Sequence, residues 1–248
     1  GSTPQRVGAK MLVFPDGRLV GTIGGGCYEN DAFWKAREAI TTRKPQLVHY
    51  ELDDDFAQET GLICGGQMSV YIEPIEPSPE LYVIGAGHVG YHLATMAQDV
   101  GFQVHVVDDR EKFASRERFP NAAEVVTEDI PTWLERTPLP AHAYVVIVTR
   151  GHNNDLDALR ALAARDLRYL GLIGSRAKVA RITDQLLSEG LPADALKQVH
   201  APIGLDIGAV TPQEIAVSIL AELIAVKHGK IKSRDAAELS MKWSKIKA

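Results

Sequence analysis

The chain has 248 residues, which is enough for one large domain or two ordinary domains, each with its own core. Its 45% hydrophobic and 24% charged residues match globular proteins, and its net charge of −5 argues against a nucleic-acid partner. No apolar run approaches the roughly 18 residues that span a bilayer. Two cysteines, Cys27 and Cys64, do not support a disulfide framework, so a reducing, cytoplasmic setting is expected.

The first part of the chain, residues 1–75, predicts a small α+β domain. The turn Pro15-Asp16-Gly17 separates two apolar segments and indicates a β-hairpin. Apolar side chains at helical spacing follow, and then two more strands. The expected elements are strands at 9–14 and 18–23, a helix at 27–40, and strands at 46–52 and 67–73. Because these elements make a thin domain, we expect a preceding strand and helix to be missing from this chain.

A linker at 74–80, with three prolines in seven residues, leads into a region where strands alternate with helices. This alternation predicts a Rossmann-like, doubly wound parallel sheet over residues 80–228. A basic tail at 229–248 follows, for which packing on a partner subunit and mobility both stay open. Strands are expected at 81–84, 103–107, 123–126, 144–148, 169–173 and near Val199, and helices at 88–100, 156–164, 177–189 and 211–227.

The turn between the first strand and first helix of this region has the sequence Gly85-Ala86-Gly87-His88-Val89-Gly90. Gly85 and Gly87 allow a tight turn with room for a phosphate, Gly90 allows close helix–strand packing, and the helix N-terminus offers free N–H groups. Asp108 ends the next strand about twenty residues on, where it could accept from a ribose hydroxyl. The turn predicts nucleotide or phosphate binding; a Rossmann-like domain without such a site is the alternative.

Three further segments follow predicted strands or precede the last helix: 149–155, 174–178 and 202–208. Because ligands of open parallel sheets bind outside the carboxyl ends of the strands, these segments are expected to surround one crevice. Arginines and a helix N-terminus there would suit an anion. The alternatives are a helix-capping or bridging role for the histidine, solvated charges for the basic residues, and satisfaction of loop amides for the aspartate. The candidates are Arg150, His152, Ser175, Arg176 and Asp206.

Both cysteines lie in glycine clusters, Gly24-Gly25-Gly26-Cys27 and Cys64-Gly65-Gly66. A thiol at the start of a helix, as expected for Cys27, is biased toward the thiolate by the helix dipole. Flanking glycines would let a bulky ligand approach it closely. A ligand or persulfide role and a role as a small buried hydrophobic residue both stay open for each cysteine.

Taken together, these motifs resemble the XdhC/CoxI family of xanthine dehydrogenase accessory proteins along nearly the whole chain. Two differences from the family pattern are Tyr28, where a smaller aliphatic residue is usual, and Gly1, which begins inside a family motif. The matching segments are 1–4 leading into 8–11, Gly21-Thr22-Ile23-Gly24-Gly25-Gly26-Cys27, Gly61-Leu62-Ile63-Cys64-Gly65-Gly66, Gly85-Ala86-Gly87-His88, Thr149-Arg150-Gly151-His152, 171–176 and 202–209.

The resemblance implies a maturation factor rather than a turnover enzyme. It implies binding of the molybdenum cofactor (molybdopterin or a dinucleotide form) and its delivery, in sulfurated form, to an apo molybdenum hydroxylase. A cysteine desulfurase would be a second partner. Apart from the resemblance, the thin first domain and the basic tail predict a homodimer. Cys64 is the first candidate for a thiol near molybdenum and Cys27 the second. With them, the expected cofactor-binding residues are Gly65, Gly66, Gly85, Gly87, His88, Gly90, Asp108, Arg150, His152, Ser175, Arg176 and Asp206.

Two other functions remain open from the residues. An oxidoreductase would use the Rossmann-like domain to bind NAD(P) or a flavin, although no hydride-transfer acid or base can be identified from spacing. A scaffold would join a desulfurase to a hydroxylase without binding a cofactor.

Overall fold

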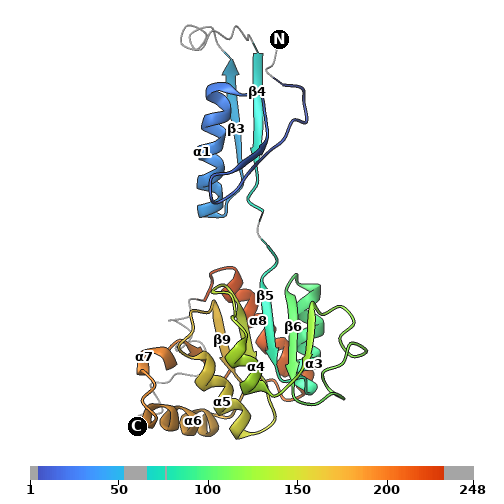
Figure 1. The fold of residues 1–248 in the computed structure, drawn as a ribbon, viewed down its shortest axis with the longest axis vertical. Coiled ribbons are helices and arrows are strands. Elements are labelled where there is room, and N and C mark those ends of the chain that lie inside the picture. Colours follow the sequence, from blue (N-terminus) through green and yellow to red (C-terminus); the bar gives the residue numbers. More distant parts are fainter. Residues whose placement is uncertain (1–4, 53–65, 76, 232–248) are drawn as a thin grey trace. The chain divides into compact units, whose positions relative to one another are not determined.

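A computed structural model describes residues 5–52, 66–75 and 77–231. Contacts between residues divide the chain into two units, residues 1–77 and 78–248, which are described separately below (Figure 1). Cys64 and Gly65, together with the tail beyond residue 231, lie outside the described residues. No helix in the described part of the chain is both long enough and apolar enough to cross a membrane.

The first unit contains two small antiparallel sheets and one helix. The hairpin predicted around Pro15-Asp16-Gly17 is present, with shorter strands than expected. Helix α1 packs on both strands of the second sheet, where even-numbered side chains such as Val48 and Val70 are the less exposed ones. The elements are β1 (Met11–Val13), β2 (Leu19–Gly21), α1 (Gly26–Thr42), β3 (Gln46–Leu52) and β4 (Gly66–Ile72).

The second unit is an α/β domain with one six-stranded, all-parallel sheet in the order β7-β6-β5-β8-β9-β10. The chain starts at β5, adds strands outward to β7, then returns to β8 and continues in the opposite direction, as in Rossmann folds. The strands are β5 (Glu80–Ile84), β6 (Gln103–Asp108), β7 (Glu124–Thr127), β8 (Tyr144–Ile147), β9 (Tyr169–Leu172) and β10 (Val199–His200). The helices are α3 (His88–Asp99), α4 (Ile130–Arg136), α5 (His152–Leu162), α6 (Arg176–Ser188), α7 (Ala193–Leu196) and α8 (Pro212–Lys227).

Helices cover both faces of this sheet, because alternate strand residues point to opposite sides (Figure 1). Leu81 and Val83 of β5 join a core with α3 and α8, whereas Tyr82 and Ile84 join a core with α4, α5 and α6. The doubly wound architecture expected from the alternation of strands and helices is therefore confirmed. Its carboxyl edge, where the strands end, carries the loops that the sequence marks as functional.

The described helices differ from the predicted set in two respects. Helices α4 and α7 were not predicted, because they span seven and four residues and are too short for a clear apolar period. Helix α5 begins at His152, four residues earlier than expected, since its first turn is polar and its apolar side chains start at Leu156.

Candidate functional site

The glycine turn follows β5, the strand that lies between β6 and β8. The strand order of the sheet reverses at this point. Gly85 has a φ of +111°, and a Cβ on it would lie 2.5 Å from the carbonyl oxygen of Val148. A Cβ on Gly90 would lie 2.0 Å from the carbonyl oxygen of Gly85, so α3 starts in direct contact with the turn. By contrast, a Cβ on Gly87 would meet no atom within 4 Å. Gly85 and Gly90 are therefore needed for packing, whereas Gly87 leaves open space beside the first N–H groups of α3.

Asp108 holds this turn from the end of β6. Its side chain is 2% exposed and accepts a 2.7 Å hydrogen bond from the Ala86 N–H. The Arg110 guanidinium donates two more bonds, from Nε at 2.7 Å and from Nη2 at 2.8 Å. Burial opposes ionisation, but the bonds from Arg110 and from Ala86 outweigh it and hold the pKa of Asp108 below its usual value. These protein donors already occupy both carboxylate oxygens, so a ribose hydroxyl would have to compete with them. The ribose-binding role of Asp108 stays a prediction.

A second arginine holds the carbonyl group of the same residue, Ala86. Arg118 donates from one Nη to the carbonyl oxygens of Ala86 at 2.9 Å and of Phe113 at 2.7 Å. Arg118 was not predicted from the sequence, because it lies in the irregular stretch between β6 and β7. Ala86 is thus bonded at its N–H by Asp108 and at its carbonyl by Arg118, so the turn is held rigidly before any ligand arrives.

The loop after β8 contributes charge on the neighbouring side of the turn. Arg150 forms a 3.5 Å ion pair with Asp109, which follows β6, so this pair joins the ends of the two strands that flank β5. His152 is half-buried in the first turn of α5. Arg150 and His152 therefore belong to the same edge as Gly85, Gly87, His88, Gly90 and Asp108.

A buried aspartate joins the loop after β8 to the start of α6. Asp155 is fully buried; it accepts a 2.6 Å hydrogen bond from the Thr149 hydroxyl and pairs with the Lys178 ammonium. Burial raises the pKa of Asp155 above its usual value, and the bonds from Lys178 and Thr149 oppose that rise. Lys178 is in turn the residue whose N–H the Ser175 hydroxyl caps at 3.3 Å. Asp155 thereby fixes the positions of two predicted site loops.

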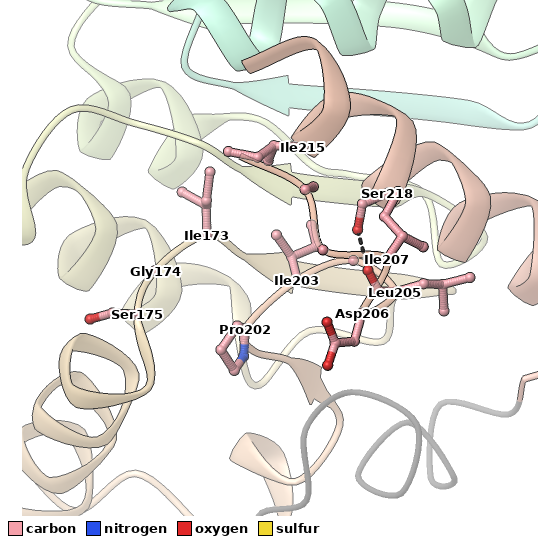
Figure 2. A pocket seen from close by; sticks show the side chains of 13 residues that line it. Ile173, Gly174, Ser175, Pro202, Ile203, Leu205, Asp206, Ile207, Ile215 and Ser218 are labelled. Carbon is pink, nitrogen blue, oxygen red and sulfur yellow. Dashed lines mark hydrogen bonds between the residues drawn. The ribbon is translucent and has the colours of Figure 1, made fainter. Parts of the chain in front are cut away.

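A pocket of about 390 Å³ lies next to these loops, at the carboxyl ends of β9 and β10 (Figure 2). Its walls come from the start of α6, from the loop at 202–209 and from the first two turns of α8. Of the site residues predicted from the sequence, Ser175 and Asp206 line it and are exposed; Arg176 is exposed beside Ser175. The predicted residues of this domain thus fall into two groups, one at the glycine turn and one at the pocket.

The pocket loop rests on a buried carboxylate that the sequence analysis did not identify. Glu222 of α8 is 1% exposed and accepts hydrogen bonds from His200 Nδ1 at 2.7 Å, the Tyr169 hydroxyl at 2.8 Å and the Gly204 N–H at 2.6 Å. Burial and then the Glu222 charge raise the pKa of Tyr169 well above its usual value, so Tyr169 stays a donor. The available signal was composition, because Glu222 is the only charged residue between Ala216 and Val226.

The predicted thiols belong to the first unit. Cys27 is exposed in the first turn of α1, after the glycine cluster, and Gly66 is the first residue of β4. Cys64, the possible molybdenum-proximal thiol, lies outside the described residues together with Gly65. Among the residues that the structure describes, no group of three or more His, Cys, Asp or Glu side chains is arranged to hold a metal ion.

Comparisons with known proteins agree with this architecture. The model of the XdhC Rossmann domain matches residues 81–223, and the model of the XdhC and CoxI family matches residues 1–51. The chain is 39% identical to the uncharacterized protein YqeB of Escherichia coli over 92% of its length, but it spans only 42% of YqeB. It is also 24% identical to the molybdenum cofactor insertion chaperone PaoD of Escherichia coli, over 92% of this chain and 80% of PaoD.

A crystal structure described as a xanthine dehydrogenase from Bacillus halodurans is similar over most of both chains. It is 26% identical, with a TM-score of 0.56, and the match covers 94% of this chain and 90% of that one. Because the Rossmann-domain model alone matches more than half of this sequence, the chain belongs to the XdhC family.

Proposed function

We propose that this chain is a maturation factor that binds the molybdenum cofactor and delivers it, in sulfurated form, to an apo molybdenum hydroxylase of the xanthine or carbon monoxide dehydrogenase class. It would act by binding and transfer rather than by turnover. The cofactor would be the cargo of this chain. The second unit would bind the terminal phosphate of the cofactor, or the nucleotide of a dinucleotide form. The name of PaoD supports the cargo, and the glycine turn supports the mode of binding.

The observation that carries the proposal is the open space at Gly87 beside the start of α3. The turn is held by Asp108 and Arg118, so the first N–H groups of the helix are fixed in direction. Fixed N–H groups at a helix N-terminus bind phosphate without a large ordering cost. Arg150 adds a positive charge on the neighbouring strand end, where its Asp109 partner could be exchanged for the phosphate.

Direct binding of the cofactor is the first test. The full chain would be incubated anaerobically with extracted molybdenum cofactor and separated by gel filtration. Bound molybdenum would be measured by mass spectrometry and the pterin by fluorescence after oxidation. We expect both to coelute with the protein in equal amounts and the complex to activate an apo molybdenum hydroxylase. A chain that never retains the cofactor under these conditions would overturn the proposal.

The two cysteines provide the second test. We propose Cys64 as the thiol nearer to molybdenum and Cys27 as the weaker candidate, in line with the family resemblance. Cys64→Ser is therefore expected to lower molybdenum retention more than Cys27→Ser does, with each variant measured beside the wild type. Equal losses, or a larger loss for Cys27→Ser, would refute this ranking.

The partners follow from the same proposal. An apo hydroxylase would receive the cofactor, a cysteine desulfurase would supply the sulfido ligand, and the chain would act as a homodimer. Exposed apolar side chains of the first unit, such as the cross-strand pair Leu47 and Tyr71, support a partner-binding role for that unit. Light scattering would measure the dimer, and pull-down with purified desulfurase and apo hydroxylase would test each partner separately.

The two alternative functions predict different binding properties. An oxidoreductase that uses NAD(P) would need the Asp108 carboxylate to bind the ribose, but Arg110 already binds both oxygens of that carboxylate. A scaffold would bind both partner proteins but retain neither molybdenum nor pterin. Titration with NADH and NADPH, followed at the absorbance of the reduced nicotinamide, distinguishes the first alternative; cofactor retention distinguishes the second.

A further inference from the structure

The pocket at the ends of β9 and β10 has a chemistry different from that of the glycine turn. Of the described residues that line it, Asp206 is the only charged one, and apolar side chains including Ile173, Ile203 and Ile207 supply much of the wall (Figure 2). Its volume of about 390 Å³ falls within the range of small-molecule sites. An apolar pocket with one carboxylate favours a flat, uncharged ring that presents hydrogen-bond donors on one edge.

Asp206 is available for such a ligand. Within the described part of the chain, it forms no ion pair and no hydrogen bond, and its side chain is exposed. This distinguishes it from Asp108, Asp155 and Glu222, three other acids of the carboxyl edge, whose oxygens are bound by protein donors. A carboxylate can only accept hydrogen bonds, and its two oxygens match two parallel N–H donors.

The loop that carries Asp206 is fixed in place at the two residues that precede Asp206. Gly204 donates its N–H to Glu222 at 2.6 Å, and the Ser218 hydroxyl donates to the Leu205 carbonyl at 2.5 Å. A Cβ on Gly204 would lie 2.4 Å from the Ser218 hydroxyl oxygen, so the loop packs directly on α8. Because the backbone is held before binding, Asp206 can select a ligand by the pattern of its donors rather than adapt to it.

We propose that this pocket binds a 2-amino-4-oxo-pyrimidine ring edge, with the Asp206 carboxylate accepting from the ring N3–H and the 2-amino group. Pterins and guanine share this edge. The proposal deepens the proposed function, on which it rests for the identity of the natural ligand. The cofactor's pterin, or the guanine of a dinucleotide form, would occupy the pocket. The phosphate would be bound separately at the glycine turn.

The matched ligand pair pterin and lumazine tests this directly. Lumazine has the same bicyclic shape, but a carbonyl oxygen replaces the 2-amino group and would face the carboxylate. In fluorescence titrations of the full chain, pterin is expected to bind about tenfold or more tighter than lumazine, the difference expected from one hydrogen bond to a charged group. Guanosine and inosine, which differ by the same amino group, form the second arm and show which ring the pocket prefers.

Asp206→Asn turns the test into a change of specificity. The new amide keeps one acceptor for N3–H and gains a donor for the lumazine carbonyl, so the variant should bind lumazine tighter and pterin about tenfold weaker. Asp166→Asn is the matched control, because Asp166 is also exposed and lies near the opposite, amino end of β9. That variant should bind both ligands as the wild type does.

The outcomes separate this inference from the proposed function. If the wild type binds neither pterin nor guanosine, the pocket assignment is overturned, even if the chain still retains and delivers the cofactor. An equal loss of affinity for pterin and for lumazine in Asp206→Asn would also overturn the pocket assignment, because the carboxylate would then act only as a general charge. Discrimination between pterin and lumazine by a chain that retains no molybdenum would support the pocket and refute the proposed function.

Discussion

Replacing Gly87 with alanine should separate ligand binding from folding. The backbone of Gly87 has a φ of −65°, which alanine adopts without strain, and an added Cβ meets no atom within 4 Å. Alanine is a poorer N-cap than glycine but restricts the unfolded chain, so the free energy of unfolding should change by less than about 1 kcal/mol. The methyl group would nonetheless project into the space proposed for the phosphate.

The effect on binding should be larger than the effect on stability. Loss of one charge-assisted hydrogen bond from a helix N–H to the phosphate would weaken cofactor binding by about 1.5–3 kcal/mol, or at least tenfold. Binding would be measured by the fluorescence of the retained pterin and stability by urea unfolding. Wild-type affinity in Gly87→Ala would show that the phosphate does not bind at this turn.

Gly90→Ala is the matched control for this experiment. Its Cβ would lie 2.0 Å from the Gly85 carbonyl oxygen, a backbone atom that cannot rotate away. Overpacking of this kind costs about 1–3 kcal/mol or more, and alanine's higher helix propensity recovers only about 1 kcal/mol. At about 2–4 °C for each kcal/mol, Gly90→Ala should lower the midpoint of thermal unfolding by several degrees. A Gly90→Ala variant as stable as Gly87→Ala would contradict the packing argument.

Two further predictions concern the buried carboxylates. Glu222→Ala leaves three donors without their acceptor, two of them buried (Tyr169 and His200) and one half-buried (Gly204). The variant should lower the free energy of unfolding by about 3 kcal/mol in urea titrations, whereas a change below about 1 kcal/mol would show that the Gly204 loop does not depend on Glu222. Because the pKa of Asp108 is lowered in the folded chain, its stabilising contribution is present above the unfolded value near 3.8 and is lost as the pH falls through the folded pKa. Asp108→Asn should therefore flatten the fall in stability below about pH 4, measured by urea unfolding at successive pH values, and an unchanged slope would contradict it.

The elements of the second unit could be predicted closely where local signals were strong. The capping box of α8 is present as expected, with Thr211 Oγ1 accepting from the Glu214 N–H at 3.2 Å and the Glu214 carboxylate accepting from the Thr211 N–H at 2.9 Å. The glycine turn also follows its expected spacing, because its demands are local: a positive φ at Gly85 and no room for a Cβ at Gly90. These features depend on residues a few positions apart, which a single sequence displays.

The side-chain partners at the carboxyl edge depended on long-range contacts and could not be predicted in this way. Asp108 lay at the expected position, but nothing in the strand pattern indicated that Arg110 would turn back onto it. Glu222 and Gly204 are 18 residues apart, and only the packing of α8 against the sheet brings them together. A sequence pattern therefore located the loops of the site, whereas the fold decided which acids are already bound and which, like Asp206, remain open to a ligand.

The distribution of these acids bears on the choice between a nucleotide enzyme and a cofactor carrier. In a dinucleotide site the acid after the second strand is available to the ribose, but here the Arg110 guanidinium binds both oxygens of Asp108, and the carboxylate in turn secures the Ala86 N–H. A ribose hydroxyl would have to displace Arg110 and weaken the turn that holds the phosphate. A ligand that ends in a phosphate without a ribose makes no such demand. The contacts of Asp108 and Arg110 therefore support the proposed binding of a cargo that ends in a phosphate, such as the molybdopterin form of the cofactor, over that of a nucleotide.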